Sequence, residues 1–153
     1  MTANLLQDLL AERGVLLADG ATGTNLFAMG LETGDAPELW NVDHPDRIAA
    51  NYQSFVDAGS DLILTNTFGG THYRLKLHDA ADRVHELNVA GVKIGCEVAA
   101  KAGRPVIIAG SIGPTGEIPE PMGSLSHADA VAAFAEQAQA LKDGAADLLW
   151  VET

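Results

Sequence analysis

Polar residues that could bind a small molecule stand at the ends of four apolar runs in the 153-residue sequence. They are Asp19, then Thr65, Asn66 and Thr67, then Ser111, and finally Glu152. A residue in such a place is often polar only because the chain is leaving the core. Two carboxylates and an Asn-Thr pair would instead form a ligand-binding site if the four runs delivered them to one rim. The organisation of the chain decides between these interpretations.

The four apolar runs are predicted to be parallel β-strands. They cover residues 15–19, 61–67, 105–111 and 147–153. Each stays apolar until its last positions, as strands buried on both faces of a parallel sheet do. Helical patterns fill the intervals, at about residues 45–59, 80–103 and 126–144. This alternation predicts an α/β fold with right-handed crossovers, either an open doubly wound sheet or a (β/α)8 barrel.

The loops of the predicted fold differ between its two rims. In both architectures the ligand binds at the carboxyl ends of the strands. The loops at those ends, residues 66–78 and 111–126, are longer than the roughly 2 to 6 residues of an ordinary connection. The connections at the opposite rim, such as "AGSD" and "AGRP", are short. Long loops on one rim are what a binding site on that side requires.

The composition excludes several classes of partner. The formal net charge is −12, and the nine Lys and Arg residues form no cluster, so neither nucleic acid nor an anionic membrane surface is expected to bind. No secretory signal is expected from the residues at the start of the sequence, and no apolar stretch approaches the roughly 20 residues of a membrane span. The single cysteine, Cys96, allows no intrachain disulfide and no thiolate metal cluster. A cytoplasmic location is expected.

Other motifs carry less information. The glycine-rich segments "GATG" and "GSIGPTGE" lack the Lys-Ser/Thr ending of a phosphate-binding loop. His72 and His78 are six residues apart, which is not the spacing of a helical metal site, and both are expected to be solvated loop residues. Cys96 is expected to be a small buried hydrophobe in a helix. Trp40, on the long segment after the first run, is expected to cover a pocket.

Four stretches, taken together, carry a family resemblance. They are "LLADGATGTNL", "ELWNVDHPDRIAANYQSFVDAGSDLILTNTFGGT", "AGSIGPTGE" and "DLLWVET". In this order they resemble the N-terminal half of the homocysteine S-methyltransferase family, which includes betaine–homocysteine methyltransferases and the homocysteine module of cobalamin-dependent methionine synthase. The resemblance implies the (β/α)8 TIM barrel, of which residues 1–153 would form a truncated half-barrel of about four parallel strands. The C-terminal half of the domain would be absent, because a complete barrel takes about 250 residues.

The resemblance also implies roles for the strand-end residues. Asp19 and Gly20 would hold homocysteine, and Glu152 would contact its amino group. Thr65, Asn66 and Thr67 would lie beside the same pocket. An amino acid offers its ammonium group to carboxylates, and a rim of low dielectric constant strengthens that attraction. Backbone N–H groups of the Gly/Thr loops could receive its carboxylate.

By the same resemblance, the chemistry is methyl transfer to a zinc-bound homocysteine thiolate, giving methionine. The donor would be a quaternary ammonium such as betaine, a sulfonium such as S-methylmethionine, or a methylated corrinoid. Betaine is preferred because no corrinoid module is attached, and Trp40 and Tyr73 could contact a cationic donor. The family's zinc ligands are three cysteines on later strands, and Cys96 matches none of them. No catalytic or metal-binding residue is therefore assigned, and the isolated chain is expected not to turn over.

Three alternatives stay open beside this interpretation. The chain could be a non-catalytic amino-acid-binding or assembly module, since a half-barrel has two open edges that favour a homo-oligomer. It could be a fragment of a cobalamin-dependent methionine synthase. A phosphate-binding barrel enzyme is disfavoured, because such sites usually lie at the last strands and no cationic clamp is expected on this rim.

Overall fold

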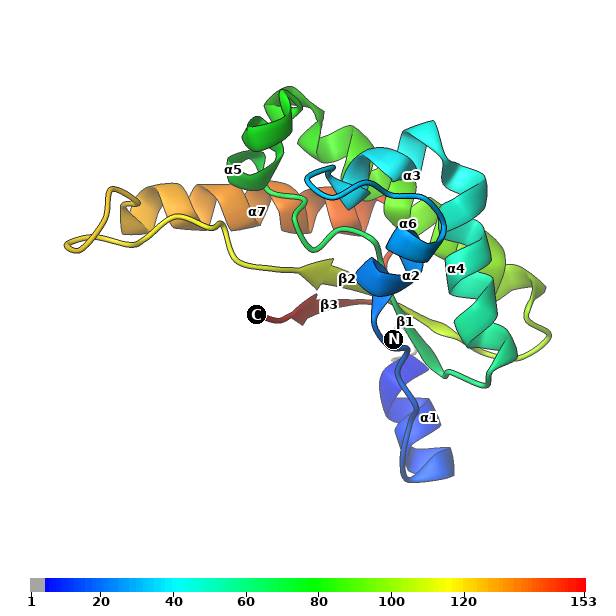
Figure 1. Cartoon of the computed structure of the whole chain (residues 1–153). Coiled ribbons are helices and arrows are strands. Elements are labelled where there is room, and N and C mark those ends of the chain that lie inside the picture. The colour runs from blue at the N-terminus through cyan, green and yellow to red at the C-terminus, as the bar shows by residue number, and fades with distance from the viewer. Residues whose placement is uncertain (1–4) are drawn as a thin grey trace.

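The computed structural model describes residues 5–153 as alternating helices and strands (Figure 1). The helices are α1 (Leu5–Arg13), α2 (Thr22–Ala28), α3 (Trp40–Asp43), α4 (Pro45–Asp57), α5 (His72–Leu75), α6 (Val84–Lys101) and α7 (His127–Asp143). The strands are β1 (Leu62–Leu64), β2 (Ile107–Ile112) and β3 (Leu148–Val151). Short 3₁₀ turns cover Pro37–Leu39, Lys76–His78 and Ala81–Arg83. No helix among residues 5–153 is long and apolar enough to cross a membrane.

The strands form a parallel sheet in the order β1-β2-β3. Leu62 pairs with Ile107, and Ala109 pairs with Leu148. The first apolar run lies beside β1 as a single parallel bridge between Ala18 and Leu62 rather than as a full strand. The predicted parallel α/β half-barrel is therefore confirmed, with one correction: in residues 5–153 the sheet has three strands, and the first predicted strand is reduced to the bridge between Ala18 and Leu62.

Burial on both faces holds for the centre of the sheet and fails at its edges. Every residue of β2 is buried. In contrast, Val15 of the first run is 78% exposed and Val151 of β3 is 79% exposed. The expectation of four fully buried strands is wrong for these two, because each lies at an outer edge of the sheet, beyond which the described residues place no further strand.

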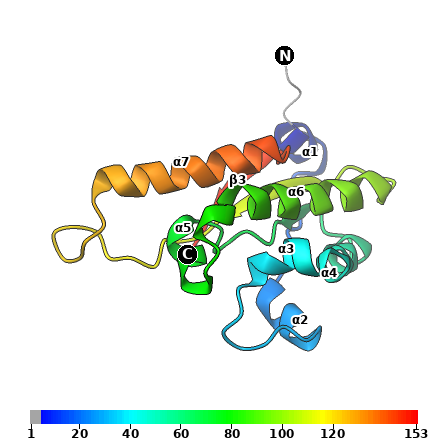
Figure 2. The ribbon, with the colours of Figure 1, turned by 90° about the horizontal axis from the view of Figure 1, so that it is seen from above.

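Helices cover one face of the sheet, and α1 lies against the other (Figure 1). Ile63 and Ile108 point into the core built with α4, α6 and α7, whereas Leu62 and Ile107 pack against Leu9 of α1. This alternation along each strand is the two-residue period of β-structure. Seen from above, α6 and α7 lie side by side over the sheet (Figure 2). The helical layer leaves the carboxyl ends of the strands open.

The predicted helix boundaries are largely confirmed. The Ser126 hydroxyl accepts a hydrogen bond from the Asp129 N–H at 3.1 Å, so the predicted cap begins α7. The helix predicted from residue 80 begins instead at Val84. Residues Ala81–Arg83 form a 3₁₀ turn instead, and Arg83, with φ of −103° and ψ of 14°, stands outside the α-helical conformation as the residue before α6.

Candidate functional site

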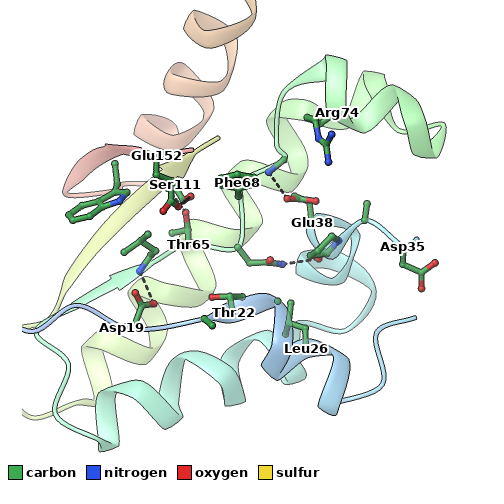
Figure 3. Close-up of a pocket in the computed structure, with 18 of the residues that line it drawn as sticks. Asp19, Thr22, Leu26, Asp35, Glu38, Thr65, Phe68, Arg74, Ser111 and Glu152 are labelled. Atoms are coloured by element: carbon green, nitrogen blue, oxygen red, sulfur yellow. Dashed lines mark hydrogen bonds between the residues drawn. The ribbon is translucent and has the colours of Figure 1, made fainter. Parts of the chain in front are cut away.

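A cavity of about 600 Å³ opens at the carboxyl ends of the strands (Figure 3). Its walls come from the turn after the first apolar run, the loop before α3, the segment after β1, α5, and the ends of β2 and β3. The residues that carry its chemistry are Asp19, Thr22, Asp35, Glu38, Thr65, Asn66, Phe68, Arg74, His78, Ser111, Trp150 and Glu152. The cavity thus lies on the rim that carries the long loops, as predicted.

Asp19 joins the first apolar run to the sheet and faces the cavity. Its Oδ2 accepts a hydrogen bond from the Leu64 N–H at 3.0 Å, and its own N–H donates to the Leu62 carbonyl at 2.9 Å. Burial raises the pKa of Asp19 to about 6, and the negative charge of Glu152 adds to the rise. A cation placed between the two carboxylates would relieve their repulsion and favour the ionised form of Asp19.

Glu152 is held in place by a chain of hydroxyl groups. Its Oε1 accepts a hydrogen bond from the Ser111 hydroxyl at 2.6 Å. The backbone N–H of Ser111 donates to the Thr65 hydroxyl oxygen at 3.1 Å, and the Thr67 hydroxyl donates to the Ser111 carbonyl at 2.8 Å. The ends of three neighbouring strands are therefore linked, so the carboxylate has a fixed position on the rim.

The predicted substrate residues fall into two groups. Asp19, Gly20, Thr65, Asn66 and Glu152 all line the cavity. Thr67 does not line it: the residue is fully buried behind the rim. Asn66 is fixed by hydrogen bonds from its amide nitrogen to the Pro37 carbonyl at 2.8 Å and to the Asn41 side chain at 2.9 Å.

The two aromatic residues predicted for a donor site do not line the cavity. Trp40 is 7% exposed and packs in the main core, with the Arg47 guanidinium 4.8 Å from the centroid of its ring. Short helix α3 turns the indole inward, so the expectation that Trp40 covers a pocket is wrong. Tyr73 packs against His72, with ring centroids 4.0 Å apart, and lies below the Lys76 ammonium. The aromatic rings at the cavity are those of Phe68 and Trp150.

A second carboxylate region, missed in the sequence, lies around Glu38. This side chain is 6% exposed, and its Oε1 accepts a hydrogen bond from the Gly69 N–H at 2.6 Å. Glycine permits this approach without displacement, because a Cβ at position 69 would lie 2.9 Å from that oxygen and the Glu38 carboxylate would have to shift. Burial raises the pKa of Glu38, while the nearby Arg74 and His78 oppose the rise. The glycine pair after the second run was the available signal for such a close approach.

Cationic groups, not expected from the sequence, also line this end of the cavity. Arg74 and His78 both belong to its wall. The expectation of no cationic clamp on this rim is therefore wrong. His78, expected to be a solvated loop residue, is partly exposed at the end of the 3₁₀ turn Lys76–His78 and also lines the cavity. Both residues lie on the turns between β1 and α6, whose path depends on tertiary packing.

No cluster of three or more His, Cys, Asp or Glu side chains that could hold a metal ion occurs among residues 5–153. Cys96 is partly buried on α6, and its thiol donates to the Ala145 carbonyl at 3.7 Å. Burial raises the pKa of this thiol, and the residue is not part of the cavity wall. The described residues therefore do not fit a zinc site.

Comparisons with known proteins agree on the family and on partial coverage. The family model described as Homocysteine S-methyltransferase matches residues 16–153. Methionine synthase of Mycobacterium tuberculosis is 35% identical over 157 residues, and the match covers 97% of this chain and 13% of that protein. The Mycobacterium leprae methionine synthase is 33% identical with the same coverage. The chain thus spans a small part of these relatives.

Solved structures give the same result for the fold. The metallated form of the homocysteine methyltransferase MmuM from Escherichia coli has a TM-score of 0.80 and 25% sequence identity, covering 97% of this chain and 57% of that one. The oxidised form of the same protein has a TM-score of 0.76. The predicted TIM-barrel family is therefore confirmed.

Proposed function

This chain belongs to the homocysteine S-methyltransferase family, and we propose that residues 1–153 are the homocysteine-binding half of such a (β/α)8 domain. One observation carries the proposal: Asp19 and Glu152 line one cavity at the carboxyl ends of the strands, close enough for the charge of Glu152 to raise the pKa of Asp19. Two carboxylates held in this way form a natural binding site for an ammonium group.

Homocysteine would bind with its amino group between these two carboxylates. Its own carboxylate would lie against the turn formed by residues 20–23, which lines the same end of the cavity and offers backbone N–H groups and the Thr22 hydroxyl. The side chain would then extend into the cavity. The role of the described residues is to bind and orient the amino acid and to keep water away from its sulfur.

The proposed reaction moves a methyl group from an onium donor such as betaine to this sulfur. The thiol loses its proton, and a bond forms between the sulfur and the methyl carbon. The bond from that carbon to the donor nitrogen breaks, and the nitrogen keeps the electron pair. Zinc, in the family, favours the thiolate; residues 5–153 contain no group to hold it, so this activation is not assigned to them. The 153-residue chain by itself is therefore proposed to bind homocysteine without turning over.

A second role, in assembly, is favoured by the exposed edges of the sheet. Val15 and Leu17 are exposed at one edge, and Leu149 and Val151 at the other. Apolar strand edges of this kind pair readily with another chain. Light scattering on the purified protein tests this role: a dimer that persists at low micromolar concentration supports it, and a monomer contradicts it.

Calorimetric titration of the full-length protein with homocysteine tests the proposed function. Asp19→Asn keeps an oxygen for the Leu64 N–H and removes the charge, so binding should weaken about ten- to hundredfold, the loss typical of a charge-assisted hydrogen bond. Asp147→Asn is the matched control, since this carboxylate also accepts a strand N–H, from Ile108 at 2.8 Å, but is not part of the cavity wall. Equal affinities for the two variants would contradict the proposal.

A further inference from the structure

A buried glutamine on α7 lies behind the rim of the cavity. Gln137 is fully buried, and it is not part of the cavity wall. The other buried residues of α7 are apolar: Ala133, Ala140 and Leu141. The amide oxygen of Gln137 has no hydrogen-bond donor among residues 5–153. Burying an amide costs free energy that an apolar side chain would not, so packing alone does not explain a glutamine at this position.

The amide nitrogen of Gln137 reaches the ends of two strands. It donates to the Thr67 carbonyl at 2.7 Å and lies 3.5 Å from the Ser111 carbonyl. Thr67 follows β1, and Ser111 belongs to β2. The Asn88 side chain of α6 accepts a hydrogen bond from the same nitrogen at 3.2 Å. Because α6 and α7 lie side by side over the sheet (Figure 2), both amides approach the strand ends from the helical layer.

The same two amides hold the segment that follows β1. The Asn88 amide nitrogen donates to the Gly70 carbonyl at 2.8 Å, and the Gly70 N–H donates to the Thr67 carbonyl at 2.9 Å. The chain passes so close to α7 that a Cβ at position 70 would lie 2.8 Å from the Gln137 amide nitrogen. The position of Thr67 is therefore set by side chains of the helical layer as well as by the sheet.

Thr67 and Ser111 connect this buried cluster to the cavity. The Thr67 hydroxyl donates to the Ser111 carbonyl at 2.8 Å, and the Ser111 hydroxyl donates to the Glu152 carboxylate at 2.6 Å. Ser111 and Glu152 lie together at the cavity wall (Figure 3). Loss of the Gln137 amide removes a donor that ties the ends of β1 and β2 together, and a shift of these ends moves the carboxylate that Ser111 holds.

We propose that Gln137 is a positioning residue, which acts through Thr67 and Ser111 to hold the Glu152 carboxylate where it binds the amino group of the substrate. The proposal rests on the proposed function, in which Glu152 and Asp19 bind that group. Gln137 lies outside the cavity wall, so its effect on binding passes through Glu152. Removing the amide should therefore matter only while the Glu152 carboxylate is present.

Calorimetric titration of the full-length protein with homocysteine tests the proposal in a double-mutant cycle of Gln137→Met and Glu152→Gln. Methionine is close to glutamine in length and has no hydrogen-bond donor. Gln137→Met should weaken homocysteine binding about threefold to tenfold, which corresponds to the net free energy of one hydrogen bond. In the Glu152→Gln background the same substitution should cause no further loss, because the carboxylate that it positions is gone. Gln137→Glu should bind better than Gln137→Met, since a buried, protonated carboxyl group keeps one donor.

A control variant separates positioning from a general loss of stability. Val98 is buried near the end of α6, beside the short connection at the opposite rim. Val98→Ala removes buried packing there and should bind homocysteine as the wild type does. Thermal unfolding confirms that each variant is folded at the temperature of the titration. Equal losses of affinity in Val98→Ala and Gln137→Met would overturn the proposal.

The remaining outcomes separate this proposal from the proposed function. Wild-type affinity in Gln137→Met, or the same loss with and without the Glu152 carboxylate, would overturn the role of Gln137. If Gln137→Met does not fold, Gln137→Glu in the two backgrounds gives the same comparison with a smaller expected loss. Failure of the proposed function would appear separately, as homocysteine binding that Glu152→Gln leaves unchanged.

Discussion

Homocysteine binding should depend on pH through Asp19. In the free protein the pKa of Asp19 is about 6, raised by burial and by Glu152, and only the ionised carboxylate attracts an ammonium group. Affinity should therefore be highest above pH 7 and fall as the pH drops through 6. At pH 5 about one tenth of the Asp19 carboxyl groups are ionised if the pKa is about 6, so affinity should be roughly tenfold lower than at pH 8. At the ordinary pKa of an Asp, near 3.9, almost no loss would occur over this range.

Titration calorimetry between pH 5 and pH 8 measures this effect. The ammonium group of homocysteine stays protonated over the range, so the change in affinity reports on the protein. Asp19→Asn is the reference, because a side chain that cannot ionise should bind weakly with a flatter profile. The difference between the two profiles isolates Asp19 from the histidines that titrate in the same range. A wild-type profile parallel to that of Asp19→Asn would refute the argument that Asp19 receives the ammonium group.

Three further predictions concern the packing of two buried residues and the activity of the isolated chain. Gly69→Ala should lower the free energy of unfolding by about 1–3 kcal/mol, measured by thermal unfolding, because its methyl group would lie 2.9 Å from Glu38. Gly23→Ala is the control, because a methyl group there would have no atom within 4 Å. Equal losses in the two variants would contradict this reasoning. Gln137→Ala should lower the free energy of unfolding by about 1–3 kcal/mol, because it removes a buried hydrogen-bond donor from the Thr67 carbonyl and the Asn88 side chain. A similar loss in Gln139→Ala, on the exposed side of α7, would show that burial is not the cause. The isolated 153-residue chain should show no methyl transfer from betaine to homocysteine with zinc present, and measurable turnover would refute its assignment as a binding half.

Much of the fold follows from local patterns in the sequence. The apolar runs and the glycines that end each helix are enough to predict a parallel sheet with intervening helices, and Ser126 with Asp129 predicts the start of α7. The exposure of the first run was harder to predict. Val15 and Leu17 are residue types typical of a buried strand, but both are exposed at an edge of the sheet. Burial at an edge depends on what packs there, which no local pattern contains.

The residues of the site likewise divide into those that local sequence patterns predict and those that they do not. Asp19, Thr65, Asn66 and Glu152 could be predicted because strand ends in a parallel sheet meet at one rim. Glu38, Arg74 and His78 could not, because they lie on loops and single helical turns whose path is set by tertiary contacts such as the hydrogen bond from the Gly69 N–H to Glu38. Trp40 shows the converse error: a tryptophan in an irregular segment was expected at a pocket, but the turn of α3 places it in the core.

A crystal structure of the full-length protein with homocysteine bound would test most directly whether Asp19 and Glu152 bind its amino group. The amino nitrogen should lie within hydrogen-bonding distance of the carboxylates of both Asp19 and Glu152, with the amino acid's carboxylate against residues 20–23. An amino nitrogen placed beside Glu38, or homocysteine bound outside this cavity, would contradict it.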